Sequence, residues 1–282
     1  MSLSLERPLL LVGVGKMGGA LLSGWLAGGL SPESVLIRDP APSPEIKLQM
    51  AEAGVSINFP IERIVERRPG VVVIAVKPQM MDAVLPDLKP LAGPDTLFLS
   101  IAAGTTLAQL SRHLGDGVRA VRSMPNTPAS VGRGITVACA NPLVSAEQKE
   151  LAGQLLASVG EVGWVRDETL IDAVTAISGS GPAYVFHMVE CLAAGGEALG
   201  LDPELAMRLA RATVSGAGEM LHRSPEPAAT LRKNVTSPGG TTAAALDVLM
   251  GQEAMSNLFL KAVTAARDRS RELSGPAART AG

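Results

Sequence analysis

Apolar residues along the first part of the chain fall into blocks of two kinds. Short runs rich in Val, Ile and Leu are separated by longer segments of helical length. Strands that alternate with helices form a parallel sheet covered by helices on both faces. The pattern therefore predicts an α/β domain with a doubly wound sheet over residues 1–165. Its expected strands span residues 9–12, 35–37, 71–76, 96–100, 118–122, 134–140 and 161–165.

The last two of these strands enclose a segment of helical length, residues 146–158. Ser145 precedes this segment and Gln148 follows three positions later, which is the spacing of a capping box. We therefore expect a helix that begins directly after Ser145.

The pattern changes after Asp167. Strand signals end there, and apolar residues recur at helical spacing, with helix-start signals such as Asp202 before Pro203. We predict that residues 166–282 form a second, all-helical domain with short loops. The expected helices span residues 183–199, 203–222, 227–233, 242–250 and 252–273.

Two helical segments of the second domain, residues 184–199 and 203–221, are apolar on more than one face. A monomer would leave much of this apolar surface in water, and exposed surface of that kind marks an interface. The sequence therefore predicts that the second domain forms an obligate homodimer.

Composition excludes several classes of partner. With 46% apolar and 18% charged residues, the chain has enough apolar side-chain area to fold. It contains four Phe, two Trp and one Tyr, so it lacks the aromatic platforms on which single-stranded nucleic acid stacks. A net charge of -2 gives no basic footprint for a phosphate backbone or an anionic membrane. We expect no nucleic acid and no membrane as partner.

Cysteine and histidine give no sign of a metal centre. Cys139 and Cys191 lie far apart in the sequence, and His113, His187 and His222 stand alone without ligand spacing. We expect reduced thiols, isolated imidazoles and no metal.

The apolar run at residues 8–12 could be mistaken for a secretion signal. Glu6 precedes it and Gly13, Gly15 and Lys16 interrupt it, so the run is too short for secretion or for a membrane span. We therefore expect a cytoplasmic location.

A glycine-rich loop, Gly13-Val14-Gly15-Lys16-Met17-Gly18, follows the first expected strand and opens a helix. In such a loop the first glycine permits a tight turn, the second lets a pyrophosphate approach the backbone, and the third lets the helix pack on the strand. Asp39 follows the second strand about 20 residues after the glycine loop, which is the spacing expected for a carboxylate that binds the ribose. The strand, the helix and Asp39 together favour a Rossmann-type dinucleotide site over a glycine-rich turn without chemistry.

Lys77 follows the third expected strand, within Val76-Lys77-Pro78. Ligands cross the carboxyl edge of such sheets, so a contact with the cofactor is one interpretation. A solvated lysine at a strand end is an equally good one by position alone.

Four further motifs, together with the glycine loop, resemble the pyrroline-5-carboxylate reductases over nearly the whole chain. Their occurrence in this order is hard to obtain by chance. They are Ala75-Val76-Lys77-Pro78-Gln79, Val121-Arg122-Ser123-Met124-Pro125-Asn126-Thr127-Pro128, Ser178-Gly179-Ser180-Gly181-Pro182-Ala183-Tyr184 and Asn234-Val235-Thr236-Ser237-Pro238-Gly239-Gly240-Thr241-Thr242.

The last of these motifs can be interpreted without the family. Residues 237–240 form a turn, and Thr241 or Thr242 begins an apolar helix, so unpaired amides converge where an anion could bind. An ordinary capped helix is the alternative.

The resemblance implies a Rossmann-type sheet followed by an all-helical dimerisation domain. It also implies hydride transfer from NADPH or NADH to the imine carbon of 1-pyrroline-5-carboxylate, which gives L-proline. Dimers in this family can join into larger rings, and two chains build each site. The resemblance assigns the residues of the site. Expected cofactor contacts are Gly13, Val14, Gly15, Lys16, Met17, Gly18, Arg38, Asp39, Ala75, Val76, Lys77, Pro78, Ala102, Ala103 and Asn234; expected substrate contacts are Ser237, Gly239, Gly240, Thr241 and Thr242, with Thr242 beside the ring nitrogen.

One segment departs from the family pattern. Members that favour the phosphorylated cofactor often have small polar or basic residues where this chain has Arg38-Asp39-Pro40. Asp39 would repel a 2′-phosphate and Arg38 would attract it. We lean towards NADH being used at least as well as NADPH.

Two other functions stay open from the sequence. A 3-hydroxyacid dehydrogenase needs a base, which such enzymes supply as a lysine on the first long helix of the second domain. This chain has no lysine between Pro182 and Leu201, which counts against that function. A nucleotide-sensing regulator without turnover is the alternative from another class.

Overall fold

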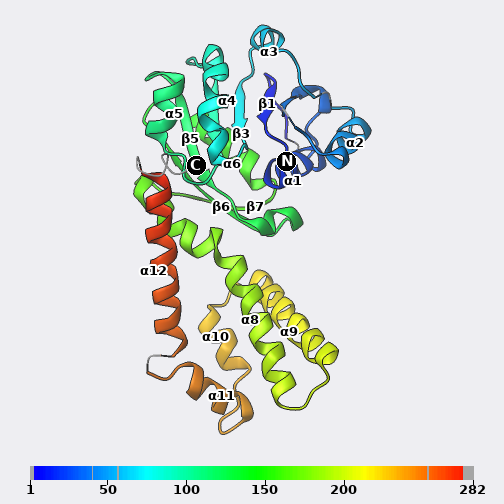
Figure 1. The fold of residues 1–282 in the computed structure, drawn as a ribbon, viewed down its shortest axis with the longest axis vertical. Helices are drawn as coiled ribbons and strands as arrows, with labels where there is room; N and C mark the ends of the chain where they lie inside the picture. The colour runs from blue at the N-terminus through cyan, green and yellow to red at the C-terminus, as the bar shows by residue number, and fades with distance from the viewer. Residues whose placement is uncertain (1–2, 40, 56, 253, 276–282) are drawn as a thin grey trace. The chain divides into compact units, whose positions relative to one another are not determined.

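The structure, a computed structural model, describes residues 3–39, 41–55, 57–252 and 254–275 (Figure 1). Contacts divide the chain into two compact units. Unit 1 runs to Gly179 and resumes at Arg267, and unit 2 comprises residues 180–266.

Unit 1 is built on a seven-stranded sheet with the order β2-β1-β3-β4-β5-β6-β7. The first five strands are parallel to one another, β6 is antiparallel to β5, and β7 is parallel to β6. Chain order reverses at β1, which lies between β2 and β3, and such a reversal is where open α/β sheets bind ligands. The strands are β1 (Leu9–Val12), β2 (Val35–Arg38), β3 (Val71–Ile74), β4 (Leu97–Ser100), β5 (Arg119–Met124), β6 (Gly134–Ala140) and β7 (Gly160–Trp164).

All seven expected strands are present, with shifts of at most two residues at their ends. The largest difference in length is at β3, which ends at Ile74; the backbone of the next residue, Ala75, lies against Gly13 of the glycine loop. The antiparallel direction of β6 was not predicted from the sequence. Its connection to β5 is too short for the crossover that a parallel pair requires.

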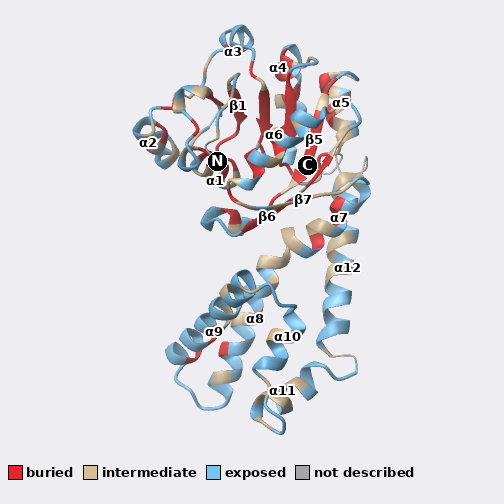
Figure 2. Cartoon of the chain, turned by 180° about the vertical axis from the view of Figure 1, so that it is seen from behind, coloured by how far each residue is buried: buried red, intermediate tan, exposed pale blue. Residues whose placement is uncertain are grey.

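Helices cover both faces of the sheet, and the buried core lies between them and the strands (Figure 2). Alternate strand residues point to opposite faces, so Leu9 and Leu11 pack with α1, α2 and α6, whereas Leu10 and Val12 pack with α3, α4 and α5. The helices are α1 (Lys16–Ala27), α2 (Pro44–Glu52), α3 (Ile61–Arg67), α4 (Met81–Leu88), α5 (Leu107–Leu114), α6 (Ala146–Ala157) and α7 (Ile171–Val174); single turns are η1 (Pro32–Ser34), η2 (Pro78–Met80), η3 (Lys89–Leu91), η4 (Thr127–Val131), η5 (Glu168–Leu170) and η6 (Thr175–Gly179).

The capping box expected before α6 is confirmed. The Gln148 amide donates to Ser145 Oγ at 3.2 Å, and the Ser145 amide donates to Gln148 Oε1 at 3.1 Å. This reciprocal pair satisfies two backbone donors and fixes the start of α6.

The division between the units differs from the boundary predicted after residue 165. The segment from η5 to η6 belongs to unit 1, and so does the end of α12 (Met255–Ser274). Ser270 on α12 donates a 2.7 Å hydrogen bond to Asp172 Oδ1 on α7, and both side chains are buried. This contact attaches the last helix of the chain to the sheet domain.

Unit 2 is all-helical, as predicted. Its elements are α8 (Gly181–Ala198), α9 (Pro203–Arg223), α10 (Ala228–Asn234), α11 (Thr241–Leu249) and the first part of α12. Asp202 caps α9 by accepting from the amides of Glu204 and Leu205. α8 and α9 pack closely at Gly196, where an added Cβ would lie 3.1 Å from Ala206 Cβ.

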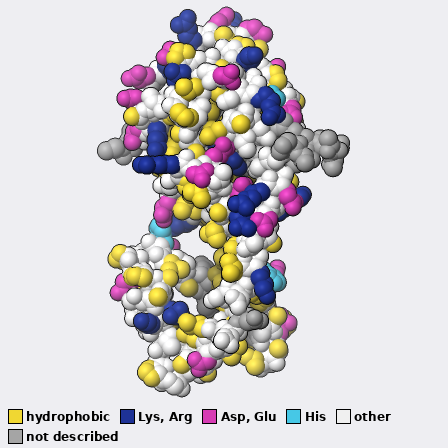
Figure 3. All heavy atoms as spheres, turned by 90° about the vertical axis from the view of Figure 1, so that its left-hand side faces the viewer, with side chains coloured by type: hydrophobic (Ala, Val, Ile, Leu, Met, Phe, Trp, Pro, Cys, Tyr) yellow, Lys and Arg dark blue, Asp and Glu magenta, His cyan; other side chains and the backbone are white. Residues whose placement is uncertain are grey.

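Unit 2 has almost no core of its own. Among its described residues, the buried apolar side chains are Ala193, Ala206 and Ala210. Large apolar side chains remain exposed on α8, α11 and α12, including Phe186 at 65%, Val248 at 74% and Leu258 at 66%. Figure 3 shows hydrophobic side chains at the surface of one face of the molecule. Within the described residues, none of the helices is both long and apolar enough to cross a membrane.

Two serines near the end of α12 give a matched test of the contact with α7. Ser270→Ala removes a donor to the buried Asp172 carboxylate, and we expect it to lower the free energy of unfolding by about 1–3 kcal/mol. Ser274 Oγ is buried without a partner among the described residues, so Ser274→Ala should be neutral or slightly stabilising. Thermal and denaturant unfolding of both variants measure the difference. Equal melting temperatures would show that the Ser270–Asp172 bond contributes nothing.

Candidate functional site

The turn between β1 and α1 requires glycine at two of its three glycine positions. Gly13 has φ +94°, and a Cβ there would lie 2.9 Å from the backbone carbon and oxygen of Ala75. A Cβ on Gly18 would collide with the Gly13 carbonyl oxygen and lie 3.1 Å from Ala75 Cβ. At Gly15, by contrast, no atom lies within 4 Å of the Cβ position. The turn therefore has no room for a side chain at its first and third glycines, whereas the space beside the second is unoccupied by the protein's atoms.

The open glycine is also the N-cap of α1. Gly15 has extended backbone, and the first hydrogen bond along the helix runs from the Gly19 amide to the Gly15 carbonyl at 2.7 Å. The amides of residues 16–18 precede this bond and have no helical acceptor. Free amides and the positive end of the helix dipole make this exposed position suitable for a phosphate.

Asp39 is bonded to the glycine loop. Its Oδ2 accepts from the Val14 amide at 2.7 Å, and its Oδ1 accepts from the Ala41 amide at 2.9 Å. Each carboxylate oxygen keeps a second lone pair, which can accept from a ribose hydroxyl. Asp39 can thus support the loop and bind a sugar at the same time.

Asn58 is a contributor that the sequence did not indicate. Its Oδ1 accepts from the Asp39 amide at 2.8 Å, and its backbone has φ 64°, a conformation that asparagine tolerates. A single parallel bridge between Ile37 and Ile57 brings it beside β2. The one available signal, an asparagine before a proline-bounded segment, is too common to be diagnostic.

Arg38, the last residue of β2, points to the other face of the sheet. Its Nη2 donates to Asp87 Oδ2 on α4 at 2.7 Å, an ion pair that the sequence did not suggest. Pro40, the third member of the unusual segment, lies outside the described residues.

The other expected cofactor residues of unit 1 follow neighbouring strands at the same edge. In the strand register, Val12 pairs with Arg38 and Ile74, and Ile74 pairs with Ser100. The loops after these residues therefore begin side by side. Those after β3 and β4 carry buried Val76 and Ala102, half-buried Ala75, and exposed Lys77, Pro78 and Ala103.

The motif on β5 is held by an ion pair between a buried arginine and a half-buried glutamate. Arg122, 4% exposed, donates to Glu168 Oε1 at 2.9 Å, and the same oxygen accepts from the Leu107 amide at 2.8 Å. Glu168, which sequence reasoning missed, thus connects β5 to the start of α5.

Burial raises the pKa of the neighbouring Cys139 thiol, and the charge of Glu168 adds to that rise. The Cys139 thiol is therefore disfavoured as a thiolate.

In unit 2, residues 237–240 form the predicted turn. The Gly240 amide donates to the Ser237 carbonyl at 3.0 Å, and Gly239 has φ +69°. Gly240 is the N-cap of α11, so Thr241 is the first helical residue and Thr242 the second. Thr241 is exposed and Thr242 is half-buried. The first amides of α11 are available to an anion here as well.

Asn234 is exposed at the end of α10 and donates to Glu226 Oε2 at 3.3 Å. The structure thus gathers the expected cofactor residues of unit 1 at one sheet edge and the expected substrate residues of unit 2 at one turn. Among the described residues, no group of His, Cys, Asp and Glu is arranged to hold a metal.

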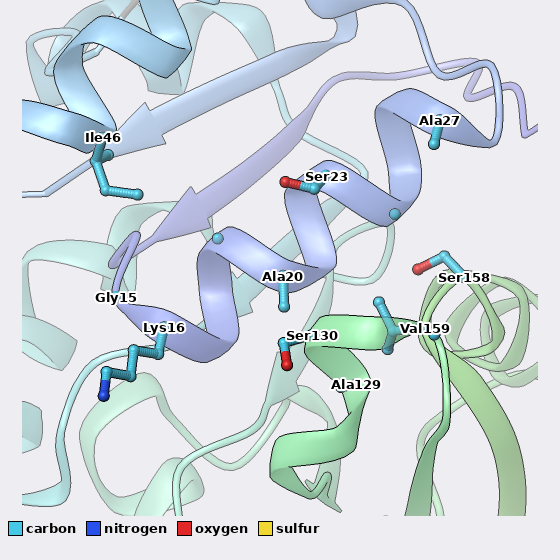
Figure 4. A pocket seen from close by; sticks show the side chains of 13 residues that line it. Gly15, Lys16, Ala20, Ser23, Ala27, Ile46, Ala129, Ser130, Ser158 and Val159 are labelled. Carbon is cyan, nitrogen blue, oxygen red and sulfur yellow. The ribbon is translucent and has the colours of Figure 1, made fainter. Parts of the chain in front are cut away.

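A cavity of about 460 Å³ lies along the outer side of α1 (Figure 4). It begins at Gly15 and Lys16 and continues between α1, η4 and the connection from α6 to β7, where Ala20 points towards Ser130. Asp39 and Ala102 are not part of its lining, so the cavity adjoins the expected cofactor position without coinciding with it.

Comparison with known proteins identifies two family matches. Pyrroline-5-carboxylate reductase dimerisation matches residues 168–273, and NADP oxidoreductase coenzyme F420-dependent matches residues 9–104. The chain is 42% identical to a pyrroline-5-carboxylate reductase of Pseudomonas aeruginosa, covering 93% of this chain and 95% of that protein. It is 38% identical to the enzyme of that name from Pisum sativum, covering 93% and 94%.

Solved structures give the same similarity. A pyrroline-5-carboxylate reductase from Coxiella burnetii superposes with a TM-score of 0.89 at 36% identity, covering 96% of this chain and 100% of that one. A pyrroline carboxylate reductase from Plasmodium falciparum, solved with NADP bound, gives a TM-score of 0.79 at 31% identity and covers 96% and 99%.

Two glycine substitutions separate the loop's folding from its ability to bind a phosphate. Gly15→Ala has room for its methyl group, so we expect a nearly unchanged melting temperature and at least about tenfold weaker dinucleotide binding, or ~1.4 kcal/mol. Gly13→Ala should lower both stability and binding, because its φ is positive and Ala75 blocks the Cβ. Melting curves and titration with NADH and NADPH measure both effects. Wild-type affinity in Gly15→Ala would exclude the loop as the phosphate site.

Proposed function

The chain belongs to the pyrroline-5-carboxylate reductase family, and from this premise we propose how its residues divide the reaction. It is an NAD(P)H-dependent oxidoreductase that reduces the C=N bond of 1-pyrroline-5-carboxylate to give L-proline, the last step of proline biosynthesis. The observation that carries this function is the similarity over 93% of the chain. The two family matches, over residues 9–104 and 168–273, include the glycine loop and the turn before α11.

We propose that unit 1 binds the cofactor. The amides at the start of α1 would hold the pyrophosphate, and Asp39 would accept from the ribose hydroxyls while it keeps its bond to Val14. The loops carrying Ala75 and Ala102 would bound the nicotinamide side, where small side chains let the ring lie close to the backbone. When bound, the reduced nicotinamide supplies the hydride.

The turn before α11 would bind the substrate. Amides of residues 239–241 would hold the carboxylate of 1-pyrroline-5-carboxylate, and the Thr242 hydroxyl would orient the ring nitrogen. A protonated imine needs little acid–base catalysis, so positioning is the main task of these residues. Asn234, at the end of α10, would complete the cofactor contacts from this side.

The chain carries a dimerisation domain over residues 168–273 and associates through it. We propose a homodimer in which two chains build each site, with larger rings of dimers as an extension. The exposed apolar side chains of unit 2 support this arrangement, because a monomer would keep them in water. We also propose that the enzyme works in the cytoplasm, without metal, nucleic acid or membrane.

Thr242→Ala tests the proposed role of the hydroxyl. We expect kcat to fall by about 10- to 1000-fold, or ~1.4 to 4 kcal/mol, because the imine loses a positioned polar partner. KM should change less, because the amides of the turn remain. Steady-state kinetics beside a melting curve measure this, and Thr242→Ser should restore most of the activity. Unchanged kcat would remove Thr242 from the mechanism, and a collapsed melting temperature would make its role structural.

The cofactor preference can be measured directly. We expect NADH to be used at least as well as NADPH, because Asp39 repels a 2′-phosphate and Arg38 is already paired with Asp87. The measurement is kcat/KM for each cofactor, with and without added 1-pyrroline-5-carboxylate. A value for NADPH about tenfold higher, ~1.4 kcal/mol in transition-state binding, would contradict the preference. Oxidation that does not depend on the substrate would contradict the function.

Oligomeric state tests the proposed interface. We expect a dimer or larger assembly at micromolar concentration, weakened by Leu258→Glu in unit 2. Leu48→Glu in unit 1 is a matched control, since Leu48 is 63% exposed and Leu258 is 66% exposed. Sedimentation and activity are measured together for each variant. A stable and active wild-type monomer would rule out the obligate dimer.

A further inference from the structure

The ion pair between Arg38 and Asp87 joins the end of β2 to α4. Arg38 Nη2 and Asp87 Oδ2 are 2.7 Å apart, with side chains 29% and 57% exposed. Arg38 also pairs with Val12 in the strand register, so its backbone lies beside the start of the glycine loop. The guanidinium therefore stands at the sheet edge where the cofactor is expected, on the face covered by α4.

Arg38 is the last residue of β2 and Asp39 follows it, and these two side chains carry opposite charges. The Asp39 carboxylate turns to the Val14 amide, whereas the Arg38 guanidinium turns to Asp87. Asp39 keeps its bond to the loop, and Arg38 is a cationic group at this strand end that could receive an additional phosphate. A guanidinium binds phosphate and carboxylate through the same planar set of donors.

We propose that Asp87 is a specificity-determining residue that disfavours NADPH by holding Arg38. This inference rests on the proposed cofactor site in unit 1. A 2′-phosphate has to compete with the Asp87 carboxylate for the guanidinium. The negative charge of that carboxylate also repels the phosphate. NADH carries a hydroxyl at that position, so it meets neither obstacle. The carboxylate of Asp87 therefore weakens the binding of NADPH and leaves the binding of NADH nearly unaffected.

The same helix offers a matched control. Asp82, also on α4, has a side chain 58% exposed and pairs with His113 Nε2 at 2.9 Å. This pair joins α4 to His113 on α5. Asp82→Asn and Asp87→Asn remove the same charge from the same helix at nearly the same exposure, and they differ in whether Arg38 is released.

The experiment compares wild type, Asp87→Asn and Asp82→Asn in two measurements. The first is kcat/KM for NADPH and NADH with 1-pyrroline-5-carboxylate, and the second is the Kd of NADP⁺ and NAD⁺ by titration calorimetry. In Asp87→Asn we expect the ratio of NADPH to NADH efficiency, and the affinity for NADP⁺, to rise about 3- to 5-fold, the upper part of the range for releasing a partly exposed charged pair. Values for NADH and NAD⁺ should change less than about twofold. Asp82→Asn should leave both ratios at the wild-type value.

Arg38→Gln in the Asp87→Asn background should abolish the gain, since the effect passes through the guanidinium. A purely structural role for the pair would weaken both cofactors alike and leave the ratio unchanged. An unchanged or lowered NADPH ratio in a folded, active Asp87→Asn enzyme overturns the proposal, and a lowered ratio would mean that Asp87 positions Arg38 for the phosphate. Absence of substrate-dependent oxidation with either cofactor in wild type would instead overturn the proposed function.

Discussion

The close approach of three backbone segments at the end of β1 governs the architecture of unit 1. Gly13, Gly18 and Ala75 meet where a side chain at either glycine would occupy the space of a neighbouring backbone or methyl group. This contact lets α1 begin directly after β1 and lets β3 end beside the loop. It also aims the Val14 amide at Asp39, so that three strand ends are connected through one turn. The free amides of α1 are available to a ligand because this turn places them at the sheet edge.

Much of this arrangement can be predicted because it is local in sequence. The alternating apolar runs determine the strands, and the glycine spacing determines the turn. Asp39 follows the second strand at a distance that the fold itself imposes. The capping box at Ser145 is equally local, since a Ser and a Gln three residues apart bond to each other's backbone. Wherever the structure depends on neighbours within one turn or one strand, the sequence pattern was sufficient.

The contacts that escaped prediction join segments distant in sequence. Asp87 reaches Arg38 across 49 positions, and Glu168 reaches Arg122 across 46. An acidic residue on a helix surface gives no sign of its partner, because the same sequence pattern is expected whether its carboxylate is solvated or paired. The contact between α12 and α7 was not predicted for the same reason. Ser270 and Asp172 are polar residues whose burial depends on packing between elements. Periodicity reports which face is apolar, and it does not report which polar groups meet.

In unit 2, exposed apolar side chains and the proposed catalytic threonine lie on the same helix, α11. Its described residues bury small alanines between α8 and α9, whereas α11 exposes Val248 and Leu249. Burial of apolar area is the main source of stability, at about 25 cal/mol per Å², so a helix with little buried area is weakly held by its own chain. Thr242 stands at the start of this same helix. In the proposed dimer, burial of the exposed side chains of α11 would also hold the turn and its threonine in place. On this proposal, association would be a condition for an ordered substrate site.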